Sequence, residues 1–435
     1  MVVVALREER VWQERLLLLL AVLFVLLNAV TLSLALSGQV RWQHLAAPAV
    51  WAVAMAAAHA TLQRYRPQRD IVLLPLFALM TGWGLVLIDR LAPNFLWRQL
   101  LWLVLGTAVL VFLAALPRRL RVLRRYRYTW LTLGIVLLLA TLIFGVNPSG
   151  QGATLWLPLP FVERVYFQPS ELLKLLLIVF LASYFDEHER VATVAPARGW
   201  RSHLTFLGPL LLMWGFSILL LVWQQDLGGA AIFFLVFLAL LYLATGQWQY
   251  VAAGLGLLLI AALIGYFSFA VVELRVDAWW NPWPDATDRA FQIVQSLYAI
   301  GAGGITGQGI GQGFPGYVPV VHSDFVFAAI AEEYGLVGSL AAIASFALLA
   351  HRGIRIAGRA RRAFDMYLAA GITVVISVQA FLIMAGVARL LPLTGVTLPF
   401  VSYGGSSLLV TSAMVGLLLY LSSRAATGSS PGQTG

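Results

Sequence analysis

Apolar segments long enough to cross a membrane recur along the whole chain. The hydrocarbon core of a bilayer takes about 20 residues of helix, and a spanning helix satisfies its own backbone hydrogen bonds. The 435 residues are 60% hydrophobic and only 11% charged, far from the composition of a soluble domain. We therefore predict an all-α, polytopic membrane helix bundle with about twelve transmembrane helices. The expected spans are 16–36, 45–63, 71–89, 97–116, 128–145, 169–185, 205–223, 227–245, 249–271, 325–350, 365–388 and 405–423.

Arginines gather in alternate connections between these spans. The positive-inside rule places the basic N-terminus, the clusters 118–127 and 352–362, and Arg424 in the cytoplasm, with both chain ends there. The net charge of +10 then indicates anchoring at a membrane face and not nucleic-acid binding. The absence of cysteine excludes disulfides and thiolate metal sites.

The longest connection, 272–324, falls on the opposite, extracytoplasmic side. It carries several tryptophans and a glycine-rich stretch at 301–316. Tryptophan favours the membrane interface, so we expect this loop to lie on or re-enter the outer leaflet. Non-helical backbone at that depth must be covered by protein or water.

The only lysine of the chain, Lys174, lies inside the span that begins at Pro169. A charge at bilayer depth is costly and marks a functional site by default. Glu171 lies three residues earlier, on the same helical face, and can form an ion pair with Lys174. The pair either holds two helices together or forms the polar floor of a cavity for a ligand with a charged head and a lipid tail.

Two further acids lie in connections. Asp226 precedes a span at a tight turn, where it fits an N-cap. Asp285 lies between Pro282, Pro284 and neighbouring tryptophans. The prolines restrict the backbone, and apolar neighbours would desolvate the carboxylate and raise its pKa, as a general base requires. A simple turn-forming role for Asp285 stays open.

Polar residues also occur where the tenth and the twelfth spans begin. Glu332 and Glu333 lie about two turns into an apolar helix. Three roles stay open for these acids: proton carriers, cation ligands or buried hydrogen-bond acceptors. The segment 391–407 ends in a glycine- and serine-rich helix start. Free N–H groups there suit an anion such as phosphate, although small residues equally suit close packing.

The motifs together resemble the SEDS family, the RodA/FtsW group of peptidoglycan glycosyltransferases. The matching segments are Phe167-Gln168-Pro169-Ser170-Glu171 with Lys174, Asp226-Leu227-Gly228, Trp280-Asn281-Pro282-Trp283 with Asp285 and Gln292, His322-Ser323-Asp324-Phe325, Glu332-Glu333, and Leu398-Pro399 with Ser402-Tyr403-Gly404-Gly405-Ser406-Ser407.

This resemblance implies polymerisation of lipid II into glycan strands at the outer face of the bacterial cytoplasmic membrane. It implies a ten-helix core at 66–425, so that 1–65 is an N-terminal extension with two spans. The small and polar residues of 426–435 predict a disordered tail. The resemblance also implies a class B penicillin-binding protein as partner, dependence on a divalent cation (magnesium or manganese), and no organic cofactor. Asp285 is the expected catalytic base. The expected substrate-binding residues are Gln168, Ser170, Glu171, Lys174, Arg275, Trp280, Gln292, Arg389 and Ser402.

The chain departs from the family pattern at several positions. Where the family usually has arginine before Trp156, this chain has Leu155, and we expect Arg275 or Arg389 to supply the missing charge. Asp288 is a second carboxylate near Asp285 and competes for the role of base. Two other functions stay open from the sequence. A flippase for lipid-linked precursors also uses intramembrane charges, and a non-catalytic scaffold would only present a transpeptidase.

Overall fold

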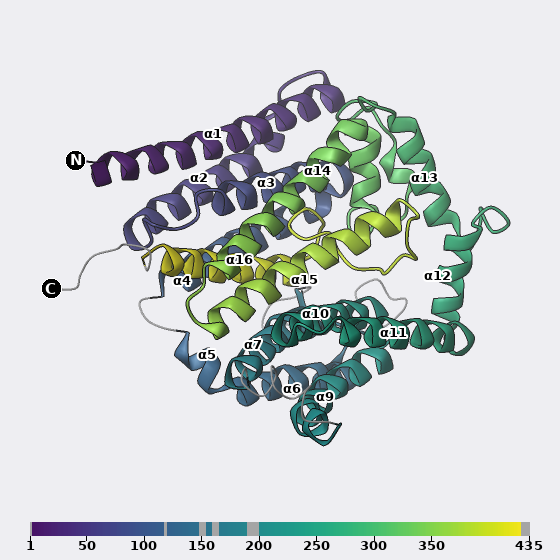
Figure 1. The fold of residues 1–435 in the computed structure, drawn as a ribbon. Coiled ribbons are helices and arrows are strands. Elements are labelled where there is room, and N and C mark those ends of the chain that lie inside the picture. Colours follow the sequence, from purple (N-terminus) through teal and green to yellow (C-terminus); the bar gives the residue numbers. More distant parts are fainter. Residues whose placement is uncertain (1, 117–119, 148–153, 159–164, 189–199, 428–435) are drawn as a thin grey trace. The chain divides into compact units, whose positions relative to one another are not determined.

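The computed structural model describes the backbone of residues 2–116, 120–147, 154–158, 165–188 and 200–427. Every predicted span coincides with a helix (Figure 1). These helices are α1 (Val2–Ser37), α2 (Trp42–Tyr65), α3 (Leu73–Leu91), α4 (Leu96–Ala115), α6 (Arg127–Phe144), α7 (Pro169–Glu187), α9 (Trp200–Trp223), α10 (Leu227–Thr245), α11 (Trp248–Ser268), α14 (Val326–Gly358), α15 (Ala363–Val387) and α16 (Gly405–Thr427).

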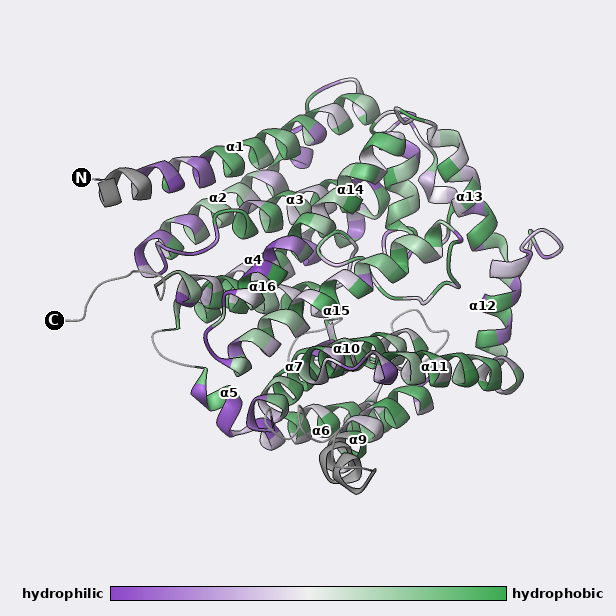
Figure 2. Ribbon diagram, viewed as in Figure 1, coloured by the Kyte–Doolittle hydropathy of each residue, from purple (hydrophilic) through white to green (hydrophobic). Residues whose placement is uncertain are grey.

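Within the described residues, 10 helices are long and apolar enough to cross a membrane, so the chain is a multi-pass helical membrane protein. The other two predicted spans are α7, which carries several charged residues, and α9, in which the described residues Trp214–Trp223 form a shorter apolar helix. The count of twelve stays a prediction. Along α1, Figure 2 shows a hydrophilic segment that is followed by a long hydrophobic stretch.

The packing of the chain divides it into two units. The first contains Met1–Ala115, Leu263–Arg352 and Gln379–Ser423, and the second contains Leu116–Ala262, Gly353–Val378 and Arg424–Gly435. The predicted tail 426–435 lies outside the described residues from position 428 onward, while positions 426 and 427 continue α16.

In the first unit, α1 and α2 pack directly against α3 and α4 (Figure 1). A Cβ atom on Gly82 of α3 would lie within 3 Å of Val25 and Trp51 side-chain atoms, so a glycine permits this close approach. Polar side chains also join α2 to the end of α3. His44 Nδ1 lies 2.7 Å from Asp89 Oδ2 at the last turn of α3.

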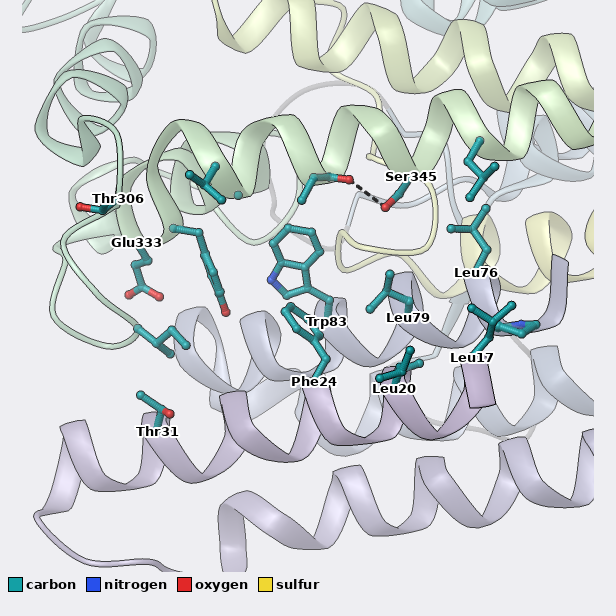
Figure 3. Close-up of a pocket in the computed structure, with 18 of the residues that line it drawn as sticks. Leu17, Leu20, Phe24, Thr31, Leu76, Leu79, Trp83, Thr306, Glu333 and Ser345 are labelled. Carbon is teal, nitrogen blue, oxygen red and sulfur yellow. Dashed lines mark hydrogen bonds between the residues drawn. The ribbon is translucent and has the colours of Figure 1, made fainter. Parts of the chain in front are cut away.

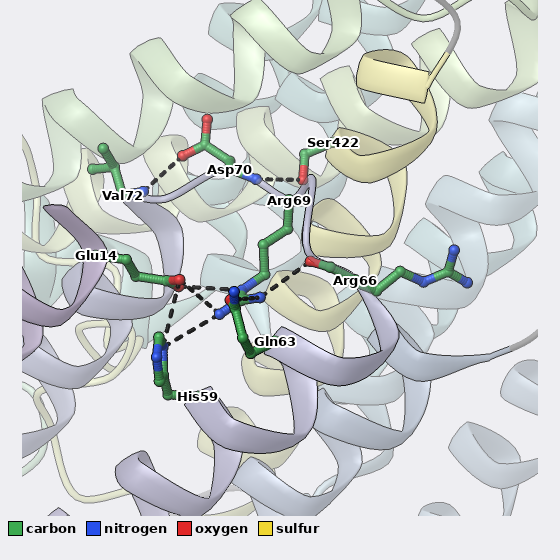
Figure 4. A network of polar contacts seen from close by, with 8 residues as sticks. All are labelled: Glu14, His59, Gln63, Arg66, Arg69, Asp70, Val72 and Ser422. Atoms are coloured by element: carbon green, nitrogen blue, oxygen red, sulfur yellow. Dashed lines mark hydrogen bonds and ion pairs between the residues drawn. The ribbon is translucent and has the colours of Figure 1, made fainter. Parts of the chain in front are cut away.

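A buried network joins α1 to the segment that precedes α3 (Figure 4). The guanidinium of Arg69 is almost fully buried and donates to both carboxylate oxygens of Glu14, at 3.1 and 2.6 Å. His59 and Gln63 of α2 complete the contacts of this arginine. A bidentate pair of this kind fixes orientation as well as distance. The first two helices are therefore tied to α3 by ion pairs in addition to apolar packing.

The helix α14 is broken at Gly335, whose φ of 66° lies in the left-handed region. The break frees the carbonyls of Glu332 and Glu333, which accept the N–H groups of Gln308 and Gly309 at 2.9 and 3.1 Å. The next two N–H groups of α14 donate back to the same glycine-rich loop. The predicted non-helical backbone is thus covered by protein, as the bilayer requires.

The long connection before α14 is mostly ordered structure. It contains α12 (Ala270–Trp280), a turn at 284–290, α13 (Phe291–Gly303) and the short 3-10 helix η3 (Pro315–Tyr317). Another 3-10 helix, η1 (Pro93–Phe95), joins α3 to α4.

In the second unit, α6 packs along α7, and a short helix α5 (Arg121–Arg125) precedes α6. The strands β1 (Leu157–Pro158) and β2 (Tyr166–Phe167) pair antiparallel immediately before α7. The side chain of Gln224, at the end of α9, donates to the Leu138 carbonyl and to Thr141 Oγ1 of α6 at 2.8 and 2.9 Å. These contacts hold the turn between α9 and α10 against α6.

Candidate functional site

Glu171 and Lys174 of α7 form a buried ion pair. Lys174 Nζ lies 2.7 Å from Glu171 Oε2, and the two residues are only 5% and 7% exposed. Pro169 starts the helix, a position where its missing N–H is not needed. Glu171 therefore lies in the first turn, where the helix dipole favours a carboxylate. The predicted ion pair is confirmed.

Gln168 and Ser170 belong to the same helix start. Gln168 Nε2 donates to Ser170 Oγ at 3.0 Å, and Ser170 is buried beside Glu171. The two predicted binding residues thus form one polar surface with the ion pair.

Asp226 joins this cluster from the start of α10. Its Oδ1 accepts the Gly229 N–H at 3.0 Å, which confirms the predicted N-cap. The same carboxylate accepts a hydrogen bond from Ser170 and lies near the charge of Lys174. Burial raises the pKa of Asp226, and the hydrogen bonds and Lys174 oppose that shift. Lys174 is therefore held between two carboxylates.

The sequence predicted a capping role for Asp226 but not its place in this cluster. A usable signal was present, because both α7 and α10 were predicted to begin on the same side of the membrane. Two helix starts on one side can bring their first turns together. Asp226 is then near the Glu171 turn for a topological reason and not by sequence proximity.

Asp285 lies in the first unit, on the turn between α12 and α13. Its backbone carbonyl accepts the N–H groups of Asp288 and Ala290, both at 3.1 Å. The turn-forming role therefore belongs to the Asp285 backbone and leaves its side chain exposed. The predicted desolvation by apolar neighbours is wrong, because the flanking tryptophans and Pro284 are themselves turned outward in part and do not cover the carboxylate.

Asp285 is one of the residues that line a small polar cleft. Asp277 and Asn281 line it from the end of α12, and Arg289 lines it from the same turn as Asp285. Asp288 is exposed as well, but it is not among the residues that line this cleft. The placement distinguishes the two candidate bases, since only Asp285 lines this cleft together with Asn281 and Arg289.

Arg275, in the middle of α12, is bound to the loop before α16. Its Nη1 donates to the Thr394 carbonyl at 3.2 Å, and its charge acts on Asp324. Ser323 Oγ donates to Asp324 Oδ1 at 2.7 Å. Burial raises the pKa of Asp324, while the Ser323 hydrogen bond and Arg275 lower it.

Ser402 and Arg389 also make contacts within the first unit. Ser402 Oγ donates to the Ser323 carbonyl at 2.5 Å and accepts the Leu398 N–H at 3.0 Å, so it joins two loops. Arg389, with φ of 56°, donates to the Trp280 carbonyl at 3.4 Å. The Trp280 side chain is 76% exposed, and Gln292 is exposed on the first turn of α13.

Glu332 and Glu333 act as hydrogen-bond acceptors at the break in α14. Glu332 Oε1 accepts the Phe314 N–H at 2.7 Å, and Glu333 Oε1 pairs with Arg90 Nε at 3.0 Å. Arg90 also donates to the Gly313 carbonyl at 2.8 Å. Of the three roles left open by the sequence, these contacts favour the third, in which the acids hold the glycine-rich loop.

Among the residues that the structure describes, no three histidine or acidic side chains gather as they would around a metal ion. Mg²⁺ commonly uses only one or two protein carboxylates and completes its shell with water and substrate phosphate. A closed metal site supplied by the protein alone does not fit this part of the chain.

Comparison with known proteins matches residues 69–427 to the FtsW/RodA/SpoVE family, described as a cell cycle protein. The peptidoglycan glycosyltransferase RodA of Mycobacterium tuberculosis is 36% identical over 383 residues, which cover 84% of this chain and 80% of that protein. A probable peptidoglycan glycosyltransferase FtsW of Geobacter sulfurreducens is 35% identical over 379 residues, covering 83% and 96% of the two chains.

Two solved structures resemble the fold. One is a chain from a peptidoglycan synthase complex studied for its coordination of polymerization and crosslinking, with a TM-score of 0.68 and 28% identity over 82% of this chain and 98% of that chain. The other is the rod shape determining protein RodA of Thermus thermophilus, with a TM-score of 0.58 and 28% identity over 82% and 97% of the two chains.

Proposed function

This chain belongs to the FtsW/RodA/SpoVE family, and we propose that it is a peptidoglycan glycosyltransferase that polymerises lipid II at the outer face of the bacterial cytoplasmic membrane. Family membership over residues 69–427 carries the proposal. The exposed Asp285 carboxylate and the buried Lys174 cluster support it, because they supply a base and a cation of the kinds that this reaction needs.

The reaction joins a GlcNAc 4-hydroxyl to the anomeric carbon of a lipid-linked MurNAc. The new carbon–oxygen bond forms as the bond to the undecaprenyl pyrophosphate breaks, and the hydroxyl proton must go to a base. Asp285 is our candidate for that base. Its carboxylate is accessible, and its turn is restricted by Pro282 and Pro284.

Lys174 is our candidate for stabilising the negative charge that grows on the pyrophosphate. Glu171 and Asp226 hold its ammonium group in place. Gln168 and Ser170 extend this polar surface. Arg275, Trp280, Gln292, Arg389 and Ser402 are candidates for further substrate contacts. Binding two bulky lipid-linked substrates in register would supply much of the rate.

A divalent cation would add positive charge at the pyrophosphate. Because the described residues do not gather into a protein-built metal site, the cation would enter together with the substrate phosphates. No step assigned here to Asp285 or Lys174 depends on it.

We also propose that a class B penicillin-binding protein, a transpeptidase, is the partner. The resemblance to a chain from a peptidoglycan synthase complex supports this assignment. The arginine distribution supports an orientation with both termini in the cytoplasm.

A single assay tests the function. The purified full-length protein in liposomes receives labelled lipid II, and the products are scored for polymer and for transbilayer movement of the label. The proposal predicts glycan polymer without added transpeptidase. Movement without polymer would establish a flippase, and the absence of both with a correctly folded protein would leave only the scaffold.

A further inference from the structure

A long apolar groove runs between α1, α3 and α14 in the first unit (Figure 3). Its volume is about 820 Å³. Leu17, Leu20 and Phe24 of α1 line one wall, and Leu76 and Trp83 of α3 line another. The polar network of α7 and the Asp285 cleft contribute no residue to it. The groove therefore has a lining of its own, with no residue in common with the Asp285 cleft of the same unit.

The groove is shaped for a chain that lies along the helices. Its lining on α1 extends from Leu17 to Thr31, a rise of about 21 Å, which is most of a hydrocarbon core of about 30 Å. On α14 the lining continues past the Gly335 break from Val337 to Leu348. Val337 and Leu348 are 61% and 43% exposed. Exposing such an apolar surface to water costs free energy. In a membrane, the acyl chain of a lipid is therefore the expected occupant of this groove.

The two ends of the groove differ in charge. At one end, Glu333 is neutralised by Arg90, and the Tyr334 hydroxyl donates to Asn28 Oδ1 at 2.6 Å. At the other end, Arg10 lies seven residues before Leu17, on the same face of α1 and about 10 Å further along the helix. Arg10 is exposed, and it forms no ion pair among the residues that the structure describes.

We propose that this groove binds one glycerophospholipid, with an acyl chain between α1, α3 and α14 and its phosphate at Arg10. The lipid would complete the packing of the first helix against the rest of the unit. Glu14 lies on α1 between Arg10 and Leu17, and its buried ion pair with Arg69 ties this part of α1 to the segment before α3 (Figure 4).

Native mass spectrometry of the detergent-purified full-length protein, titrated with phosphatidylglycerol, tests the proposal. After detergent exchange, the wild type should retain one phospholipid per protein molecule. Ala341→Trp places a large side chain in the groove and should weaken retention about tenfold. Ala347→Trp is the matched control, because Ala347 is exposed on the same helix but does not line the groove. It should bind as the wild type does.

Arg10→Gln removes the charge without touching the apolar walls. It should weaken phosphatidylglycerol binding several-fold and leave the binding of diacylglycerol, which has no phosphate, unchanged. Wild-type protein that retains no phospholipid would overturn the proposal without reference to any variant. Equal retention by Ala341→Trp and the wild type would overturn it as well, as would a retained polyprenyl phosphate in place of the phospholipid. None of these measurements requires glycosyl transfer.

Discussion

The α7–α10 cluster and the Asp285 turn hold their charged side chains in opposite environments, one buried and one exposed. Lys174 is buried between Glu171 and Asp226, so its position is set before any substrate arrives. Asp285 is exposed on a turn, so its position is set by backbone hydrogen bonds and prolines while its carboxylate stays open. A buried charge that loses its partner destabilises the fold, whereas an exposed acid can be removed at little cost. Function and stability should therefore be coupled in the first region and separable in the second.

The largest expected effect is at the exposed acid. Asp285→Asn should lower the rate of lipid II polymerisation by about 10²–10⁴-fold, the usual contribution of a general base. Its melting temperature should stay at the wild-type value, because the exposed side chain changes while the backbone hydrogen bonds of the turn are kept. Gel analysis of the polymer and differential scanning fluorimetry on the same preparation measure both quantities.

Asp288→Asn is the matched control, with the same change three residues away on the same turn. It should polymerise lipid II at nearly the wild-type rate. A loss of activity in this variant together with an active Asp285→Asn would move the role of base to Asp288.

The next largest effect is at the buried pair. Lys174→Ala leaves Glu171 buried without its cation and should destabilise the protein by about 3–5 kcal/mol, while lowering polymerisation further than that instability explains. The double variant Glu171→Gln with Lys174→Met removes both charges. It should recover most of the stability and little of the activity. Recovery of both together would show that the pair only holds the helix in place.

A smaller effect is expected at Asp226. Asn is also a good N-cap, so Asp226→Asn should keep the Gly229 contact and the stability of α10, yet lower activity about tenfold by removing a charge beside Lys174. Asp226→Ala should additionally cost about 0.5–2 kcal/mol for the lost cap. Polymerisation rates and melting temperatures of the two variants separate the roles. Identical activity in Asp226→Asn and the wild type would reduce Asp226 to a cap.

The smallest effect concerns Asp324, which is half-buried beside Arg275. Burial raises its pKa above the ordinary 3.8, so the folded state holds a proton that the unfolded state releases, and stability falls as pH rises through that interval. Asp324→Asn removes this titration. Its melting temperature should therefore vary less with pH from about pH 4 upward. A steeper dependence in the variant would contradict the assigned direction.

The sequence predicted the helices well, because an apolar run of about 20 residues has few alternatives in a membrane. It also predicted the Glu171–Lys174 contact, since residues three apart share a helical face. The contact of Asp226 with that pair depends on which helix starts lie together, and spacing along the chain does not encode that. The exposure of Asp285 depends on how the tryptophans turn, which composition alone cannot decide.

The measurement closest to the central claim compares binding with turnover in two variants. Labelled lipid II is titrated against Asp285→Asn and against the Glu171→Gln, Lys174→Met double variant, and polymerisation is followed in the same samples. If the exposed acid performs the proton transfer and the buried lysine holds the pyrophosphate, Asp285→Asn keeps its affinity and loses turnover, while the double variant loses affinity. Full turnover by Asp285→Asn, or unchanged affinity in the double variant, would contradict this division of roles.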